Sequence, residues 1–224
     1  MVEENLIKEL EMYFSLYEDE YTKEELEFVR DNFVEFYKEG IHIDIISQIF
    51  TALEIKKGDD KYKKYFEYLK DKYSLDKNIL EVACGHFPAL SKHIDEYQRK
   101  VNTGTITAYD PRLVTTKYGN IKLYKKLFDE SIDISNMSLI TGMFPSEATT
   151  KIIEIANAKN KDFSVLTCGC AHLPEEEFFY YPTSMSSWQN YLYKLAKTDL
   201  DSSRTIDIDY IDGIDTPIIS SRKK

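Results

Sequence analysis

The segment Leu80-Glu81-Val82-Ala83-Cys84-Gly85-His86-Phe87-Pro88 decides how this sequence is interpreted. A short apolar run, 79–83, carries one acidic residue and leads into small residues, and a stretch with helical spacing, 89–97, follows. Small residues in such a turn allow backbone N–H groups to approach a ligand closely. In open α/β sheets these turns lie at the carboxyl ends of strands, where ligands bind. The simpler alternative is an ordinary turn between a strand and a helix.

The alternation of strand and helix continues to the end of the chain. Short apolar runs bounded by turn residues predict strands, and longer stretches with helical spacing predict helices. This order is typical of a parallel α/β sheet with helices on both faces. We expect strands at 79–83, 106–109, 121–128, 138–142 and 163–167, helices at 89–97, 147–158 and 187–200, and a closing hairpin formed by 205–211 and 217–221.

The first 75 residues show a different pattern. Apolar residues recur at helical spacing in four stretches, and Thr22 with Glu25 forms a capping box at the start of the second. No linker rich in Gly, Pro or Ser separates these stretches from the first strand. We therefore expect an all-helical segment, 1–75, packed beside the ligand site of an α/β domain, 76–224.

Composition narrows the possible partners. The chain has 224 residues and a formal net charge of −10, which opposes non-specific binding to DNA. The lysines between residues 56 and 72 form one basic stretch, either a solvated helix surface or a binding patch. No apolar run is long enough to span a bilayer, and the acidic N-terminus lacks a signal-peptide pattern. The three cysteines favour reduced thiols, so we expect a cytoplasmic protein.

Two more acidic residues stand at the ends of expected strands. Asp110 follows the strand at 106–109, and Asp129 follows Phe128 at the end of the third strand. A carboxylate at such a position offers two acceptor oxygens to the donors of a ligand. The alternatives are that Asp110 caps a helix before Pro111 and that Asp129 belongs to a solvated acidic loop.

Over about residues 78–224, these segments resemble the class I S-adenosylmethionine-dependent methyltransferases. The first motif of that family is an acidic residue followed by G-x-G-x-G. Here Glu81 takes the acidic position, Ala83 and Gly85 take the first two glycine positions, and Phe87 replaces the third. The resemblance implies a Rossmann-like, doubly wound, seven-stranded α/β sheet that binds S-adenosylmethionine. In that fold Asp110 would hold the two ribose hydroxyls, and Asp129 would accept from the adenine amine.

The resemblance also implies which residues contact the cofactor. They lie at or just after the carboxyl ends of the first four expected strands: Glu81, Ala83, Cys84, Gly85, His86, Pro88, Asp110, Phe128, Asp129, Gly142 and Met143.

The loops after the fourth and fifth strands resemble one branch of the family, which includes members assigned to RNA modification. That branch has a G-L-H-x-C-x-x-A-T-like loop and then C-C-x-H-like residues. Gly142 and Ala148-Thr149 match the first pattern, whereas Phe144-Pro145-Ser146 departs from its His and Cys. The second pattern is approximated by Cys168, Cys170 and His172.

At the same strand ends we expect His172 and Glu147 to act on the acceptor, with His172 as a base or an orienting group. Glu147 also suits simple stabilisation of a helix N-terminus. Two alternatives remain for the second pattern. Its small residues could merely line the sheet edge, or Cys168, Cys170 and His172 could bind zinc with Cys84. We predict no metal, because structural zinc normally takes four ligands and no second cysteine pair exists.

The activity implied by the resemblance is methyl transfer from S-adenosylmethionine to an unidentified acceptor, either a small molecule or RNA. One rival is a degenerate relative that binds a ligand or partner without turnover, which Phe87 and the Phe144-Pro145-Ser146 loop favour. A second rival is a nicotinamide dehydrogenase on a related sheet. The absence of G-x-G-x-x-G at the first loop weighs against it.

Overall fold

The computed structural model describes residues 61–85, 88–113, 118–168, 185–198 and 200–224. The chain divides into two compact units, Met1–Asp60 and Lys61–Lys224, and the description below concerns the second. The first three helices expected from the sequence lie outside the described residues, and so does the expectation that they cover the ligand site.

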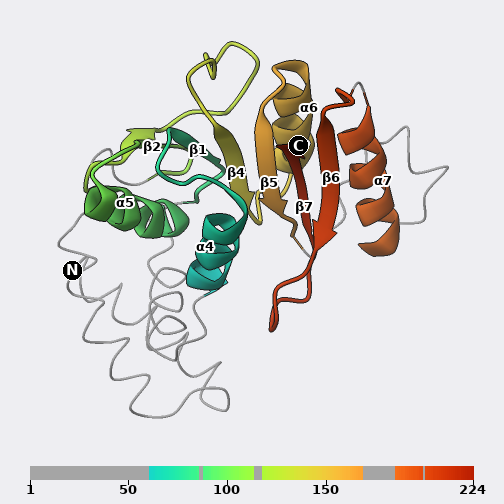
Figure 1. Cartoon of the computed structure of the whole chain (residues 1–224), viewed down its shortest axis with the longest axis horizontal. Coiled ribbons are helices and arrows are strands. Elements are labelled where there is room, and N and C mark those ends of the chain that lie inside the picture. The colour runs from blue at the N-terminus through green and yellow to red at the C-terminus, as the bar shows by residue number, and fades with distance from the viewer. Residues whose placement is uncertain (1–60, 86–87, 114–117, 169–184, 199) are drawn as a thin grey trace, which may run out of the picture. The chain divides into compact units, whose positions relative to one another are not determined.

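Seven strands form one sheet in the order β3-β2-β1-β4-β5-β7-β6 (Figure 1). Neighbouring strands from β3 to β5 pair in parallel, whereas β7 pairs antiparallel with both β5 and β6. The predicted set of five parallel strands and a closing hairpin is therefore confirmed. The strand bounds are β1 Ile79–Val82, β2 Ile106–Tyr109, β3 Lys122–Tyr124, β4 Leu139–Met143, β5 Asp162–Leu166, β6 Arg204–Asp209 and β7 Ile218–Lys223.

The third strand is shorter than the predicted range of 121–128. It pairs with β2 only through Lys122–Tyr124, and its first and last residues, Lys122 and Tyr124, are exposed. The chain then turns, with the backbone N–H of Lys126 donating to the carbonyl oxygen of Tyr124 at 2.9 Å. The apolar residues after this turn produced the longer prediction, but they leave the sheet and line a pocket instead.

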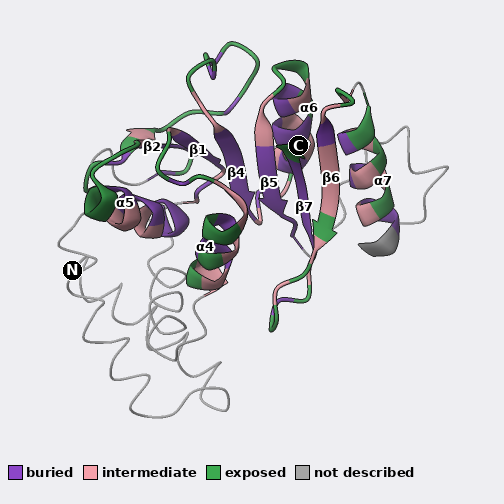
Figure 2. Cartoon of the chain, viewed as in Figure 1, coloured by how far each residue is buried: buried purple, intermediate pink, exposed green. Residues whose placement is uncertain are grey.

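Four helices pack against the sheet in two pairs. The helix α4, Lys61–Lys72, and the helix α5, Ala89–Val101, share one apolar cluster with strand residues such as Ile79 and Leu139. The helix α6, Ala148–Ala158, and the helix α7, Met185–Lys197, share the other with residues such as Leu80 and Ile140. Consecutive strand residues thus point to opposite faces, as the period of two requires. Figure 2 shows the strands between the two layers as buried and β6 as only partly buried.

The connections explain where a ligand site arises. β1 lies between β2 and β4; α5 leads from β1 to β2, and α6 leads from β4 to β5 on the opposite face. The chain therefore leaves the carboxyl ends of β1 and β4 in opposite directions. A crevice at such a switch point is the usual ligand site of doubly wound sheets.

α4 belongs to the same compact unit as the sheet rather than to the N-terminal segment alone. Its tyrosines bond to polar residues of the sheet face that it covers. The Tyr65 hydroxyl donates to Ser164 Oγ and shares a hydrogen bond with Thr141 Oγ1, both at 3.0 Å. The Tyr68 hydroxyl donates to Asp209 Oδ2 at 2.7 Å. These bonds satisfy the buried hydroxyl of Tyr65 and the half-buried hydroxyl of Tyr68, and a buried hydroxyl without a partner would be costly.

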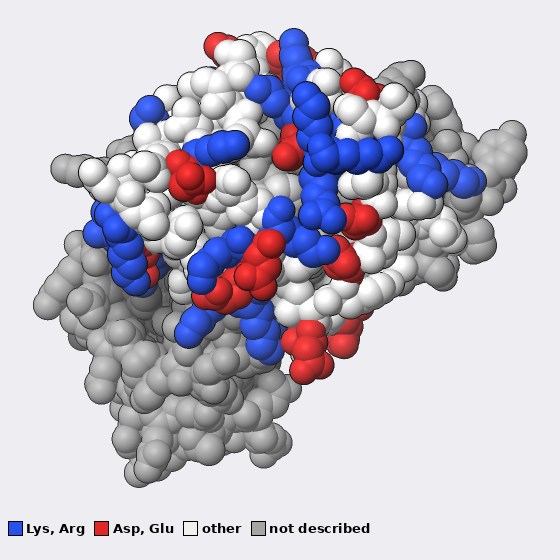
Figure 3. Space-filling model, in the orientation of Figure 1, with Lys and Arg blue, Asp and Glu red and all other residues white. Residues whose placement is uncertain are grey.

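Basic and acidic side chains lie side by side on the surface seen in Figure 3. Two ion pairs involve aspartates of β6. Asp209 pairs with Lys72 of α4 at 3.3 Å, and Asp207 pairs with Arg222 of β7 at 3.5 Å. Within the described part of the chain, no helix combines the length and apolar character needed to cross a bilayer.

Candidate functional site

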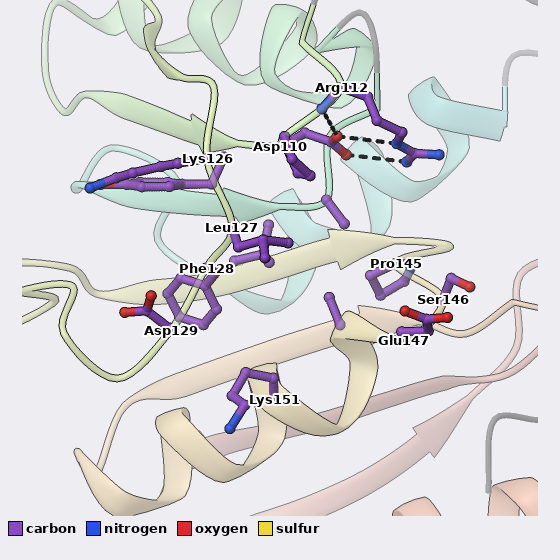
Figure 4. A pocket seen from close by; sticks show the side chains of 15 residues that line it. Asp110, Arg112, Lys126, Leu127, Phe128, Asp129, Pro145, Ser146, Glu147 and Lys151 are labelled. Carbon is purple, nitrogen blue, oxygen red and sulfur yellow. Dashed lines mark hydrogen bonds and ion pairs between the residues drawn. The ribbon is translucent and has the colours of Figure 1, made fainter.

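A cavity of about 540 Å³ lies at the carboxyl ends of β1, β2 and β4 (Figure 4). Its walls come from the ends of these strands, from the segment after β3 and from the start of α6. The lining residues are Val82, Ala83, Tyr109, Asp110, Pro111, Arg112, Lys126, Leu127, Phe128, Asp129, Pro145, Ser146, Glu147, Ala148 and Lys151.

Asp110 is the most constrained charged group in this cavity, with only 2% of its surface exposed. Its Oδ2 accepts from the backbone N–H of Gly85 at 2.9 Å, and its Oδ1 accepts from the backbone N–H of Arg112 at 2.7 Å. The Arg112 guanidinium adds one bond to each oxygen, both at 3.2 Å. Burial alone would raise the pKa of Asp110, but these hydrogen bonds outweigh it and hold the pKa below its ordinary value. Asp110 is therefore an anion at neutral pH.

The turn after β1 is held against the end of β2. The backbone N–H groups of Ala83 and Cys84 both donate to the carbonyl oxygen of Tyr109, at 2.8 and 3.4 Å. Ala83 has a φ of 58° and Gly85 a φ of 77°, so both positions that correspond to motif glycines adopt left-handed backbone. Ala83 lines the cavity. Gly85 and Pro88 lie outside the set of lining residues, and His86 and Phe87 lie outside the described residues.

Glu81 points away from the cavity. It is 1% exposed, and its Oε2 accepts from both the backbone N–H and the hydroxyl of Ser91 in the first turn of α5. Burial, only partly offset by these two bonds, raises the pKa of Glu81 to about 7. The structure thus places Glu81 under the start of α5, and its contact with a cofactor stays a prediction.

The segment after β3 forms the apolar wall. Phe128 is buried and meets the Tyr109 ring edge-on at 6.4 Å, whereas Leu127 is 68% exposed at the cavity. Tyr109 also stacks on Tyr124 at 4.8 Å. The Asp129 carboxylate lines the cavity and accepts from the hydroxyl of Ser131 at 2.5 Å and from its backbone N–H at 2.9 Å. These two bonds lower the pKa of Asp129. Phe128 and Asp129 therefore both line the cavity, and their contact with an adenine stays a prediction.

The loop after β4 forms the opposite wall. Pro145, Ser146 and Glu147 line the cavity across from Asp110 (Figure 4). Gly142 and Met143 are buried in β4 and are not among the residues that line the cavity. A Cβ atom on Gly142 would lie 2.9 Å from Ile152 Cδ1 and 3.0 Å from the carbonyl oxygen of Val82. Gly142 therefore permits close packing between β4, β1 and α6, and its cofactor role stays a prediction.

The expected cysteine and histidine group is only partly visible. Cys84 is buried and its Sγ donates to the carbonyl oxygen of Gly85; burial above all raises the pKa of this thiol, which disfavours the thiolate that a metal would need. Cys168 is also buried, whereas Cys170 and His172 lie outside the described residues. In the part of the chain that can be described, no three His, Cys, Asp or Glu side chains are grouped to hold a metal ion.

Sequence reasoning missed three basic residues of the cavity: Arg112, Lys126 and Lys151. Lys126 lies over the rings of Tyr109 and Tyr124, at 5.5 and 5.7 Å from their centroids. Lys151 Nζ pairs with Glu130 Oε1 at 2.6 Å. The only sequence signal for Arg112 was its position two residues after Asp110, because an Asp side chain often accepts from the backbone N–H two residues on.

These features fit the adenosine part of S-adenosylmethionine. The cavity combines an ionised carboxylate, an aromatic and aliphatic wall and a tight backbone turn, as a ribose, an adenine and their linkage require. The strand order, the antiparallel β7 and the cavity at the switch point together define a class I methyltransferase fold.

Comparisons with known proteins add only distant likenesses. No family model and no curated protein matches this chain. An S-adenosylmethionine-dependent methyltransferase from Aquifex aeolicus is similar at 15% identity and a TM-score of 0.45, over 75% of this chain and 96% of its own. The plantazolicin methyltransferase BpumL, in complex with a pentazolic desmethylPZN analog and SAH, is similar at 11% identity and a TM-score of 0.48, over 91% and 99%.

A third similar structure is the N,N-8-amino-8-demethyl-D-riboflavin dimethyltransferase RosA from Streptomyces davawensis, at 9% identity and a TM-score of 0.46, over 91% of this chain and 71% of its own. At such identities and TM-scores, the function has to be argued from the site itself.

Proposed function

We propose that this chain binds S-adenosylmethionine in the cavity and transfers its methyl group to a small-molecule or RNA acceptor. The observation that carries the proposal is the Asp110 carboxylate, buried, ionised and placed at the end of β2 beside the turn that follows β1. A carboxylate in this position suits two vicinal hydroxyls, because each oxygen can accept from one of them.

The remaining walls suit the rest of the nucleoside. Phe128 and Leu127 offer apolar surface to an adenine ring, and Asp129 offers acceptor oxygens to its exocyclic amine. Ala83, at the end of β1, lets the ligand approach the backbone closely. Together these residues would fix the nucleoside, so that the sulfonium end lies toward the loops after β1 and β4.

When bound, the cofactor supplies an electrophilic methyl group, so the chain has to contribute alignment and proton handling. Glu147 lines the cavity and is exposed, so its carboxylate could take a proton from an acceptor that must be deprotonated. His172 is the alternative base that the sequence suggests. A cytoplasmic setting is part of the proposal, supported by Cys84 and Cys168, which are buried cysteines that form no disulfide among the described residues.

The first test is Asp110→Ala, measured by titration calorimetry with S-adenosylmethionine. We expect binding to weaken by about 1–3 kcal/mol, the range for losing hydrogen bonds to a charged group. Asp95→Ala is the matched control, because Asp95 is also buried and pairs with an exposed arginine, Arg99, on α5. Unchanged affinity in a folded Asp110→Ala protein would remove Asp110 from the site.

The second candidate function is ligand binding without turnover. The Phe144-Pro145-Ser146 loop favours it, because Pro145 and Ser146 occupy the wall where an acceptor-handling loop is expected. Incubation with methyl-labelled S-adenosylmethionine and fractionated RNA and metabolites distinguishes the two. Label transfer that falls on the order of 10²-fold in Glu147→Gln, at unchanged cofactor affinity, would support methyl transfer with Glu147 as the base. Tight cofactor binding with no label transferred to any fraction would favour the binding protein.

A further inference from the structure

The Asp110 carboxylate has no acceptor capacity left for a ribose. An ionised carboxylate offers about four lone-pair positions. Backbone N–H groups of Gly85 and Arg112 take one on each oxygen, and the Arg112 guanidinium takes one more on each. A diol therefore cannot add its two hydroxyl donors unless two existing donors leave.

The four donors differ in how easily they can leave. The N–H groups of Gly85 and Arg112 belong to the backbone of two turns that are held by further hydrogen bonds, such as the bonds from Ala83 and Cys84 to Tyr109. The guanidinium belongs to a side chain that is 61% exposed and lies at the cavity (Figure 4). Of the four, the two guanidinium donors are the ones that can move without breaking a turn.

The guanidinium also presents the same arrangement of hydrogen-bond donors as the proposed ligand. Its Nε donates to Oδ1 and its terminal nitrogen to Oδ2, one donor to each oxygen at 3.2 Å. Two ribose hydroxyls on neighbouring carbons would present the same pattern of two donors to two oxygens. We propose that the Arg112 side chain is an internal competitor of the nucleoside diol, which occupies the acceptor positions of Asp110 and must swing away before the ribose can bind. This inference rests on the proposed nucleoside site.

The effect of the Arg112–Asp110 ion pair on nucleoside affinity should be small. An ion pair with one exposed partner contributes little, so its loss on ligand binding weakens apparent affinity by about two- to fivefold. Salt screens the pair further. Nucleoside affinity of the natural chain should therefore increase as the salt concentration rises, which is the reverse of the usual effect of salt on an ionic contact with a ligand.

The test uses adenosine, which is uncharged, so that removing a cation does not change its long-range attraction to the protein. Calorimetric titrations compare the natural chain, Arg112→Met and Arg99→Met at about 20 mM and about 500 mM salt, which spans weak to strong screening. Arg99 is a matched control, since it is 54% exposed and pairs with a buried aspartate, Asp95, outside the cavity. 2′,3′-Dideoxyadenosine serves as the ligand without the diol.

We expect Arg112→Met to bind adenosine about two- to fivefold more tightly than the natural chain at low salt, with the difference shrinking at high salt. Arg99→Met should match the natural chain, and the gain should be smaller for the dideoxy ligand. Equal or weaker adenosine binding by Arg112→Met would overturn the competition while leaving the proposed site intact. Failure of every variant to bind both adenosine and S-adenosylmethionine would instead overturn the proposed function, and the competition with it.

Discussion

The two faces of the sheet are built from different kinds of residues. The face toward α6 and α7 carries almost only apolar side chains on the central strands: Leu80, Val82, Ile140, Phe163, Val165 and Ile219. The face toward α4 and α5 places a buried polar group on each of the same strands: Glu81, Thr141, Ser164 and Ser220. The helices differ in the same way, because α4 supplies tyrosine hydroxyls and α5 supplies Ser91 to those groups.

This difference shows that the same strands are stabilised by two mechanisms. Apolar contacts have no required direction, so the α6 and α7 layer depends on buried area and close packing. Buried hydroxyls and carboxylates require partners at defined positions, so the α4 and α5 layer depends on geometry.

The largest effect is expected on the apolar face. Phe163→Ala should lower the free energy of unfolding by about 3–5 kcal/mol, because it opens a cavity in a fully buried cluster. Urea denaturation measures the change. Phe163→Leu, which keeps most of the volume, should cost less than about 1.5 kcal/mol. If Phe163→Ala lowered the free energy of unfolding by less than about 1.5 kcal/mol, the α6 and α7 layer would not depend on close packing.

The next effect is a pH dependence of the free energy of unfolding that Glu81 causes. Its folded pKa of about 7 lies above the ordinary value of 4.5, so between these values the folded chain keeps a proton that the unfolded chain has lost. Stability contributed by this proton is therefore lost as pH rises toward 7, at a rate of up to about 1.4 kcal/mol per pH unit.

Glu81→Gln should remove this dependence. Urea denaturation at about pH 5 and about pH 8 should show that the natural chain loses about 2.5 kcal/mol more than the variant over this range. The other titrating groups are common to both proteins, so the comparison isolates Glu81. Parallel pH profiles would show that the carboxylate is accommodated as an anion and that this part of the polar face imposes no cost.

The smallest effect is expected for Tyr65→Phe. The substitution keeps the ring but removes the hydroxyl that bonds to Thr141 and Ser164, so we expect a loss of about 1–2 kcal/mol from unsatisfied buried groups. Adding Ser164→Ala removes one of the orphaned partners, so the double variant should lose less than the sum of the two single variants. Simple additivity would contradict the proposed role of hydroxyl pairing under α4.

The local pattern of residues predicted most of the fold. Apolar runs and helical spacing placed β1, β2, β4, β5 and the hairpin, as well as α5 to α7, within a few residues of their observed bounds. The same pattern set the order of elements and placed Asp110 directly after β2, where it lines the cavity. Phe128 and Asp129 also line the cavity, although β3 ends before them, at Tyr124. It failed at the third strand, because apolar residues that leave a sheet to form a pocket wall look locally like a strand that continues.

The sequence by itself determined which elements form and in what order, since both follow from periodicities that span only a few residues. Only the tertiary structure decided which way the buried acids point. Glu81 and Asp110 both stand at the ends of neighbouring strands, yet one turns to Ser91 under α5 and the other meets Gly85 and Arg112 at the cavity. These partners lie up to 25 positions away along the chain. The pairing of β1 with β2 brings Asp110 to Gly85, and the packing of α5 on the sheet brings Ser91 to Glu81; no local pattern encodes either contact.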